Sequence, residues 1–246
     1  MSEPPGIEVI IPALNEEGSI AAVIHGLLAQ GATRVIVADN GSTDQTASLA
    51  KQAGATVVFE PCRGYGRACQ AGLAALRDAE IVVFADADGC DDPGDLPRLL
   101  APLRAQQADL CIGSRRAGTP APGALPLHSR FGNGLAALGM RVCFGQHVTD
   151  MGPFRAIRRD ALARLHLSEP NFGWNVEMQA KAALAGLRVV EIPVSYRQRV
   201  SGQSKITGNL QKSLQAGAVI LGSILKYRLL GWRALRRPRT FTAGSR

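Results

Sequence analysis

Residues 80–93 read EIVVFADADGCDDP, and this stretch decides how the rest of the chain can fold. Residues 81–85 are apolar and rich in β-branched side chains, which predicts a buried strand. Asp86 and Asp88 follow, and residues two apart on an extended backbone point the same way. Their carboxylates repel each other unless a cation lies between them, and such oxygen ligands suit Mg²⁺ or Mn²⁺ with a substrate diphosphate. The alternative is an acidic turn that caps a helix starting near residue 94.

The same strand, loop and helix pattern repeats before this stretch. Apolar strands are predicted at residues 7–11, 35–38 and 56–59, with helices at 19–30, up to 53 and at 67–76. This repetition predicts an α/β fold with a mostly parallel central sheet and helices on both faces. Ligands of such sheets bind beyond the carboxyl ends of the strands. Glu16, Asp39 and the Asp86–Asp88 pair all follow predicted strands, so we expect one shared nucleotide site.

The second half of the chain is less regular. We predict helices at residues 94–106, 130–144 and 172–185, and strands at 109–113, around 150–157 and at 187–196. Residues 117–126 are rich in Pro and Gly, so they are predicted to form a loop without a core. The phosphate-binding GxxxxGK[ST] loop is absent, and the glycines at 64 and 66 lack the third glycine of a dinucleotide fingerprint.

Composition narrows the classes of partner. The chain has 246 residues and a net charge of +8, which favours an anionic partner. Aromatic residues make up only 5% of the chain, which argues against nucleic-acid binding. Five cysteines without a CxxC pair, and an N-terminus without a signal-peptide pattern, lead us to expect a cytoplasmic protein with reduced thiols.

The last part of the chain has a different pattern, so we predict a catalytic domain at residues 1–208 and a basic amphipathic tail at 209–246. Residues 213–225 are mostly apolar but shorter than the about 20 residues needed to span a bilayer. Arginines and lysines follow this run. Two interpretations stay open: a helix that lies on the inner face of a membrane, or a helix that packs on the domain. Self-association as a homodimer is a further use of the tail.

Seven segments in order resemble the family 2 glycosyltransferases of the GT-A fold, in particular dolichol-phosphate mannose synthase and bacterial polyprenyl-phosphate glycosyltransferases. The segments are IPALNEEGSI (10–20), VIVADNGSTDQT (35–46), RGYGRACQAG (63–72), VFADADG (83–89), IGSR (112–115), DMGPFRAI (150–157) and RVSGQSK (199–205). The resemblance covers residues 7 to about 205. It implies a metal-dependent, inverting transfer of a sugar from a UDP- or GDP-linked donor.

The resemblance also implies roles for residues that bind the donor. Pro12, Leu14 and Glu16 would line the nucleoside pocket, with Glu16 on the ribose, and Asp39 would bind the base. Asp86 and Asp88 would hold the divalent metal against the diphosphate. Arg199 and Lys205 would close over that diphosphate. Two departures stand out, because Asn40 replaces an Asp common in the family, and Cys90 replaces the Gln of mannose synthases.

On the acceptor side, the resemblance implies that Arg115 and Arg130 grip a phosphate and that Glu177 lies beside the acceptor. A polyprenyl phosphate is largely ionised near neutral pH, so it needs positioning rather than a general base. A hydroxyl acceptor would need a base, for which Glu177 and Asp150 are the candidates. Two other functions stay open: a sugar nucleotidyltransferase, and a non-catalytic assembly protein with the same fold.

Overall fold

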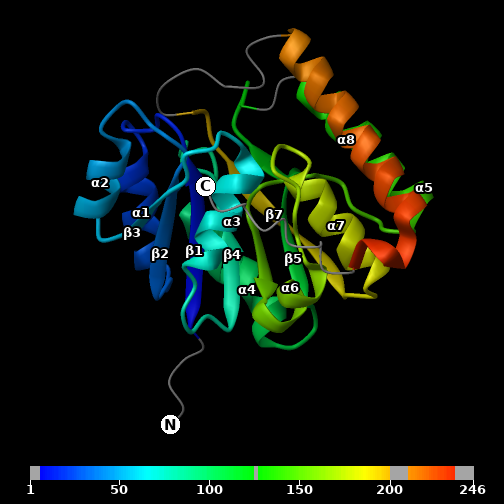
Figure 1. The fold of residues 1–246 in the computed structure, drawn as a ribbon, viewed down its shortest axis with the longest axis horizontal. Helices are drawn as coiled ribbons and strands as arrows, with labels where there is room; N and C mark the ends of the chain where they lie inside the picture. Colours follow the sequence, from blue (N-terminus) through cyan, green and yellow to red (C-terminus); the bar gives the residue numbers. More distant parts are fainter. Residues whose placement is uncertain (1–5, 125–126, 200–209, 236–246) are drawn as a thin grey trace, which may run out of the picture.

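The computed structural model describes residues 6–124, 127–199 and 210–235 and contains a seven-stranded sheet (Figure 1). The strands lie in the order β3-β2-β1-β4-β6-β5-β7. Only β6 runs antiparallel to its neighbours β4 and β5. The prediction of a mostly parallel sheet is therefore confirmed. The strands are β1 (Ile7–Ala13), β2 (Arg34–Asp39), β3 (Thr56–Phe59), β4 (Ile81–Phe84), β5 (Leu110–Pro120), β6 (Arg155–Arg158) and β7 (Val189–Tyr196).

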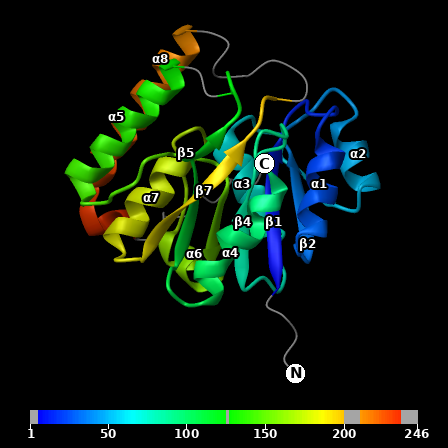
Figure 2. The same cartoon turned by 180° about the vertical axis from the view of Figure 1, so that it is seen from behind.

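Helices cover both faces of the sheet, as Figures 1 and 2 show from opposite sides. Successive residues of β4 alternate between two cores, because neighbouring side chains on a strand point to opposite faces. Val83 packs with helices α1, α2 and α4, and Val82 packs with α3 and α5 to α8. The helices are α1 (Ile20–Ala29), α2 (Thr46–Gln52), α3 (Tyr65–Ala74), α4 (Leu96–Arg104), α5 (Leu127–Phe144), α6 (Arg159–Leu165), α7 (Trp174–Leu184) and α8 (Leu210–Leu230), with 3₁₀ turns η1 (Pro93–Asp95) and η2 (Gly231–Leu235).

The prediction of a loop at residues 117–126 is wrong for its first part, because β5 continues to Pro120. After a register shift, Thr119 pairs with Ser195 and Pro120 pairs with Tyr196 of β7. Gly118 makes this pairing feasible, since a Cβ there would lie 1.9 Å from the carbonyl oxygen of Val194. A partner strand distant in sequence thus outweighs the local signal of Pro and Gly.

The region around residues 150–157 also differs from the expected strand. Only Arg155–Arg158 form β6, and the helix α6, which the sequence pattern did not reveal, follows at once. Residues 150–154 are irregular instead, and the Phe154 carbonyl accepts a hydrogen bond from the Gly113 amide of β5. Within this segment, Asp150 bonds Arg115, and the Gly152 carbonyl accepts a hydrogen bond from Arg155.

The C-terminal helix α8 packs beside α5 and α7, and Figures 1 and 2 both show α5 and α8 side by side. Ile224 and Tyr227 are buried in this contact. The opposite side of α8 exposes Leu225 and Leu229, and α5 exposes Val142. No helix in the described ranges has both the length and the apolar character needed to cross a bilayer.

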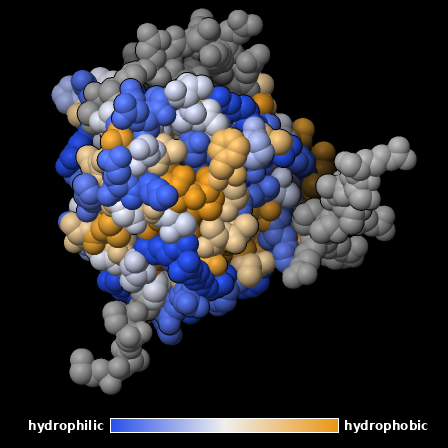
Figure 3. Space-filling view, turned by 60° about the vertical axis from the view of Figure 1, so that its left-hand side comes forward, coloured by the Kyte–Doolittle hydropathy of each residue, from blue (hydrophilic) through white to orange (hydrophobic). Residues whose placement is uncertain are grey.

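The other end of the sheet, where β3 is the edge strand, has a more mixed surface. Figure 3 brings this side forward and shows hydrophobic residues surrounded by hydrophilic ones. Phe59, at the end of β3, is 67% exposed. Scattered exposed apolar residues of this kind are normal on a protein surface. On the opposite side of the molecule, exposed apolar residues are concentrated on α5 and α8.

Candidate active site

The carboxyl ends of β1, β2 and β4 meet at one edge of the sheet, as expected. Ala13 at the end of β1 pairs with Asp39 at the end of β2, and Ile10 pairs with Phe84 of β4. Pro12 and Leu14, both half-buried, lie at the end of β1. The loops that follow these strands carry the predicted donor-binding residues to this edge.

Arg199 connects two of these loops. Its Nη1 lies 2.9 Å from Glu16 Oε2, and its Nη2 lies 3.0 Å from Asp88 Oδ2. The Arg199 side chain is 20% exposed, and it reaches the site from the segment after β7. Two carboxylates from different loops therefore share one cationic group. The structure brings Glu16, Asp88 and Arg199 together, whereas Lys205 lies outside the described residues.

The Asp86–Asp88 pair lies beside this arginine, with Asp88 buried and Asp86 half-buried. Asp86 Oδ1 accepts a hydrogen bond from the Tyr65 hydroxyl at 3.2 Å, and Asp88 Oδ1 accepts one from the Cys90 amide at 2.9 Å. Burial, followed by the charge of Asp88, raises the pKa of Asp86 to about 7. Burial and the same aspartate raise the pKa of the Cys90 thiol to about 12, so Cys90 carries no thiolate. Two carboxylates that resist joint ionisation form a place where an added cation is stabilised.

The described residues include no cluster of three or more His, Cys, Asp and Glu side chains arranged to hold a metal. A Mg²⁺ site in proteins needs only one or two carboxylates, because substrate phosphates and water complete its shell. Asp86 and Asp88 are the side chains that fit this role. Arg199 already places a positive charge against Asp88.

Asp39 contributes to the shape of the site through its own loop. Its carboxylate accepts a hydrogen bond from the Ser42 amide at 3.2 Å, and it is 5% exposed. Asn40 donates to the carbonyl oxygens of Glu60 and Cys62, and it accepts from the Gly64 amide. The Asn in place of a second Asp thus ties β2 to the start of α3.

Asp91 lies three residues after Asp88 in the same loop, and the sequence pattern assigns it no separate role. It is 6% exposed, and neither oxygen of its carboxylate has a side-chain hydrogen-bond partner. Burial raises the pKa of Asp91, and so does the charge of Asp86, while Arg115 opposes them. A buried polar group without a partner is rare and needs an explanation. Only its place in the acidic stretch at residues 86–92 marks it in the sequence.

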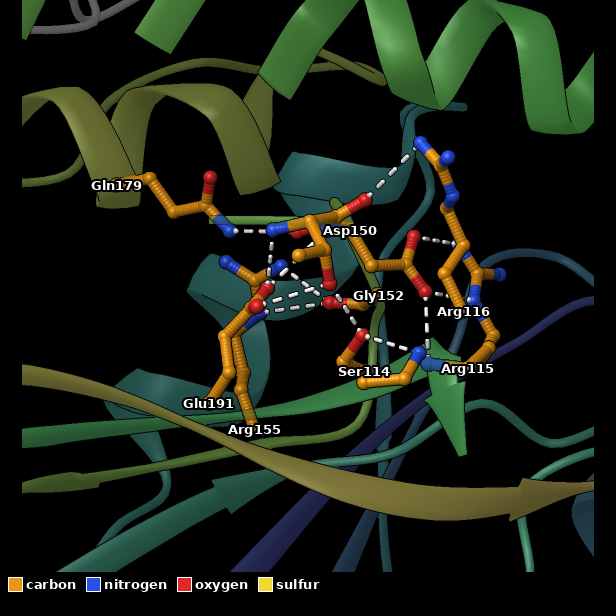
Figure 4. Close-up of polar contacts among 10 residues, drawn as sticks. Ser114, Arg115, Arg116, Asp150, Gly152, Arg155, Gln179 and Glu191 are labelled. Carbon is orange, nitrogen blue, oxygen red and sulfur yellow. Dashed lines mark hydrogen bonds and ion pairs between the residues drawn. The ribbon is translucent and has the colours of Figure 1, made fainter. Parts of the chain in front are cut away.

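Arg115 and Asp150 form a buried ion pair next to the site (Figure 4). Arg115 Nε and Nη2 each lie 2.7 Å from an oxygen of Asp150, and the Arg115 amide donates to Asp150 Oδ2 at 2.9 Å. The guanidinium also lies 5.1 Å from the centre of the Tyr196 ring. Burial disfavours the charge on Asp150, but the bonds from Arg115 outweigh burial and lower its pKa. Asp150 is therefore a poor candidate for a general base.

The segment around this pair is held by further polar contacts that Figure 4 also shows. Glu191 of β7 accepts hydrogen bonds from the Thr149 and Asp150 amides, and Gln179 of α7 donates to the Asp150 carbonyl. Arg155, which is fully buried, donates to the Gly152 carbonyl. The position of Arg115 is thus fixed by several elements.

Glu177 occupies a different environment from the one expected of a residue that touches the acceptor. It is fully buried in α7, and its carboxylate lies 2.8 Å from Lys181 Nζ. It also accepts hydrogen bonds from the amides of Ser168 and Glu169. Through these bonds Glu177 holds the segment that precedes α7. Arg130 lies in α5, and its side chain is outside the described part of the chain.

That segment packs against the start of α3, which carries Tyr65. The Arg67 amide donates to the Pro170 carbonyl at 3.0 Å. A Cβ at Gly66 would lie 1.8 Å from the carbonyl oxygen of Glu169, so only glycine fits. The pattern Gly64-Tyr65-Gly66 therefore positions the hydroxyl that bonds Asp86. The sequence predicts the turn but not this connection.

Comparison with known proteins places these features in context. The family model described as glycosyl transferase family 2 matches residues 8–165. An uncharacterised glycosyltransferase of Mycobacterium tuberculosis is 42% identical over 85% of this chain and 94% of its own length. The undecaprenyl-phosphate mannosyltransferase of Micrococcus luteus is 32% identical over 82% of this chain and 87% of its own. A solved structure of glucosyl-3-phosphoglycerate synthase from M. tuberculosis, with Mn²⁺, UDP-glucose and phosphoglyceric acid, has a TM-score of 0.69 and 26% identity, covering 89% of this chain and 80% of that one.

Proposed function

We propose, from the premise that this chain belongs to glycosyl transferase family 2, that it moves a sugar from a nucleotide diphosphate sugar to the phosphate of a polyprenyl-type lipid. The chain is a glycosyltransferase by this membership. The donor, the metal and the acceptor are the proposed parts. The donor and the metal receive support from the site geometry and from a structural relative that holds Mn²⁺ and UDP-glucose.

One observation carries the donor assignment. Arg199 lies between Glu16 and Asp88, at the edge where β1 and β4 end. A nucleotide diphosphate sugar offers this edge a ribose with hydroxyl donors and a diphosphate with negative charge. Glu16 can accept from the ribose hydroxyls, and Arg199 can then pair with the diphosphate. The arginine fork binds two oxygens at once, which suits phosphate.

The group that most needs electrostatic stabilisation during the transfer is the leaving nucleoside diphosphate. Breaking the bond between sugar and diphosphate leaves negative charge on the nucleoside diphosphate. Asp86 and Asp88 would hold a divalent metal, which would supply positive charge there. Arg199 would add hydrogen-bond donors to the same oxygens, and preorganised donors of this kind usually give the largest catalytic effect. Lys205, which lies outside the described residues, is the second proposed donor. Tyr65 fixes the orientation of Asp86 through its hydroxyl.

The acceptor assignment follows from the state of the candidate bases. A hydroxyl acceptor needs a base, but Asp150 is bonded to Arg115, and Glu177 is bonded to Lys181 and two amides. A phosphate acceptor is already ionised and needs only positioning. Arg115 and Arg130 are the proposed contacts for it. The named mannosyltransferase relative supports a lipid phosphate, whereas the phosphoglyceric acid of the structural relative supports a small phosphorylated acceptor as the alternative.

We also propose that the exposed apolar residues of α5 and α8 contact a membrane surface. Leu138 and Val142 of α5, and Leu225 and Leu229 of α8, are all more than half exposed. Lys226 and Arg228 lie between the latter two in sequence, and basic side chains beside an apolar stripe suit an anionic bilayer surface. The proposed tail at residues 209–246 would then share this docking surface with α5.

Calorimetry tests the donor first. Wild type is titrated with UDP- and GDP-sugars with and without Mn²⁺, beside Asp88→Asn and the control Asp92→Asn. Asp92 is adjacent in sequence, but its carboxylate caps η1 and pairs with Arg197. We expect Mn²⁺-dependent binding of one donor class that Asp88→Asn loses and Asp92→Asn retains. Absence of nucleotide binding in wild type would reject the donor assignment and favour an assembly protein.

A second experiment tests the acceptor with the donor so identified. Polyprenyl phosphate, the matching polyprenol and phosphoglyceric acid are offered in parallel, and radiolabelled product is measured. Transfer to polyprenyl phosphate alone supports the proposal. Transfer to the polyprenol refutes the phosphate requirement, and transfer to phosphoglyceric acid alone refutes the lipid. Pyrophosphate release from a nucleoside triphosphate and a sugar phosphate would instead indicate a nucleotidyltransferase.

A further inference from the structure

Asp91 differs from the other carboxylates of the site in having no side-chain partner. Asp86 accepts from Tyr65, and Asp88 accepts from Cys90 and pairs with Arg199. Both oxygens of Asp91 are buried and have no side-chain donor, although the backbone amide of Asp86 interacts with this carboxylate. Leaving such a group unsatisfied costs about 1–3 kcal/mol and more for a charged group, so a folded protein rarely retains one without use.

The backbone on both sides of Asp91 is held by the end of β7. Asp91 pairs with Tyr196 as an isolated antiparallel bridge, and the Arg197 amide donates to the Cys90 carbonyl at 2.7 Å. The end of β7 therefore clamps the residues on either side of the Asp91 side chain. The carboxylate stays inside, within electrostatic range of Asp86, Asp88 and Arg115.

We propose that Asp91 accepts hydrogen bonds from the hydroxyl groups of the transferred sugar. This inference rests on the proposed function, because it needs a nucleotide diphosphate sugar in this site. It identifies Asp91 as a residue that binds substrate and sets which sugar is used. The assignment concerns recognition of the sugar ring and is separate from holding the metal or the nucleoside.

Of the three parts of the donor, the sugar is the one that can donate hydrogen bonds to Asp91. A diphosphate offers only acceptors and repels a carboxylate. The nucleoside is assigned to the ends of β1 and β2, where Glu16 and Asp39 lie. The sugar is the remaining part with hydroxyl donors, and it is bonded directly to the diphosphate that Asp88 and its metal would hold. Asp91 lies three positions after Asp88 in the same loop, whereas Glu16 belongs to the loop after β1.

A hydroxyl–carboxylate contact also explains why a buried, unpartnered group is useful for selectivity. A site built to bond a substrate hydroxyl rejects an analogue that lacks the hydroxyl, because the buried group is then left unpaired. Asp91 therefore gives discrimination between sugars that differ in one hydroxyl group.

The test compares binding of the nucleoside diphosphate with binding of its sugar derivative. Wild type, Asp91→Asn and the control Asp92→Asn are titrated by calorimetry with Mn²⁺ and UDP or GDP, and then with the matching sugar nucleotide. We expect Asp91→Asn to bind the nucleoside diphosphate as wild type does and to bind the sugar nucleotide about 10- to 100-fold more weakly. A deoxy analogue of the sugar should lose affinity for wild type but not for Asp91→Asn.

Each other outcome overturns the proposal in a distinct way. Weaker binding of the nucleoside diphosphate itself would make Asp91 a metal ligand. Unchanged binding of the sugar nucleotide with lost turnover would make it a base for the acceptor. Unchanged binding and turnover would give it no role in the site. Thermal unfolding separates these results from misfolding, because removing an unpaired buried carboxylate should leave Tm equal or higher. If wild type binds no nucleotide, the proposed function fails before this inference is reached.

Discussion

Replacing Asp150 by Asn should strongly destabilise the protein, because it leaves the charge of Arg115 without its partner. Asp150 is fully buried, and the Arg115 side chain is only 13% exposed. The Asp150 carboxylate accepts hydrogen bonds from the Nε, the Nη2 and the amide of Arg115, at 2.7, 2.7 and 2.9 Å. Asn keeps the shape and one acceptor oxygen but loses the negative charge.

The magnitude follows from the cost of breaking a buried ion pair. Removing one partner typically costs about 3–5 kcal/mol, because the remaining charge stays buried. For a chain of this size each kcal/mol lowers Tm by about 2–4 °C, so Asp150→Asn should lower Tm by about 6–20 °C. Removing both charges in Arg115→Gln with Asp150→Asn should recover part of the loss, since neither group is then an unpaired ion.

Urea unfolding followed by circular dichroism measures the free energy of unfolding for wild type, both single variants and the double variant. Arg188→Gln is the matched control, because it breaks the exposed pair with Asp109 and should cost far less stability than Asp150→Asn. A loss below about 1 kcal/mol for Asp150→Asn, or strictly additive single and double variants, would refute the reasoning.

Three further predictions concern other parts of the site. Gly66→Ala should lower Tm and weaken nucleotide binding, since its Cβ would meet the Glu169 carbonyl at 1.8 Å, whereas Gly217→Ala in α8 meets nothing within 4 Å; equal Tm values for the two variants would contradict this. Burial and Asp88 raise the pKa of Asp86 to about 7, so its contribution to stability is greatest below about pH 4 and is lost as pH rises through 7. A bound cation replaces that proton, so Mn²⁺-dependent UDP or GDP binding should strengthen from about pH 6 to 8 and release protons in calorimetry with different buffers; binding independent of pH argues against it. Glu177→Gln should cost about 3–5 kcal/mol in urea unfolding because Lys181 stays buried, and a fully stable but inactive variant would instead support direct contact with the acceptor.

The sequence predicts the parts of this fold that depend on local pattern. The first four strands carry compact apolar runs, and the Asp and Gly residues after them mark the loops at the carboxyl edge. Glu16, Asp39 and the Asp86–Asp88 pair can therefore be assigned to one edge of the sheet from the sequence alone. The structure brings Glu16 and Asp88 together through Arg199, a residue that the family resemblance identifies.

The remaining features depend on contacts between residues distant in sequence. β5 extends through Gly118 only because β7 lies beside it, and Arg115 meets Asp150 across 35 positions. Glu177 is expected beside the acceptor, but its contacts with Ser168 and Lys181 show a buried structural position. The isolation of Asp91 is a property of its surroundings, which no local pattern can reveal.

The ion pair of Arg199 also sets an order of events during synthesis of the chain. Arg199 follows Asp88 by 111 positions and Glu16 by 183. At about 5–20 residues per second, a ribosome needs about 5–20 s to add the stretch between Asp88 and Arg199. The two aspartates after β4 thus exist on the nascent chain before their own counter-charge has been made. Until residue 199 has been added, Glu16 and Asp88 lack the arginine that joins them, so the connection between their two loops forms only then.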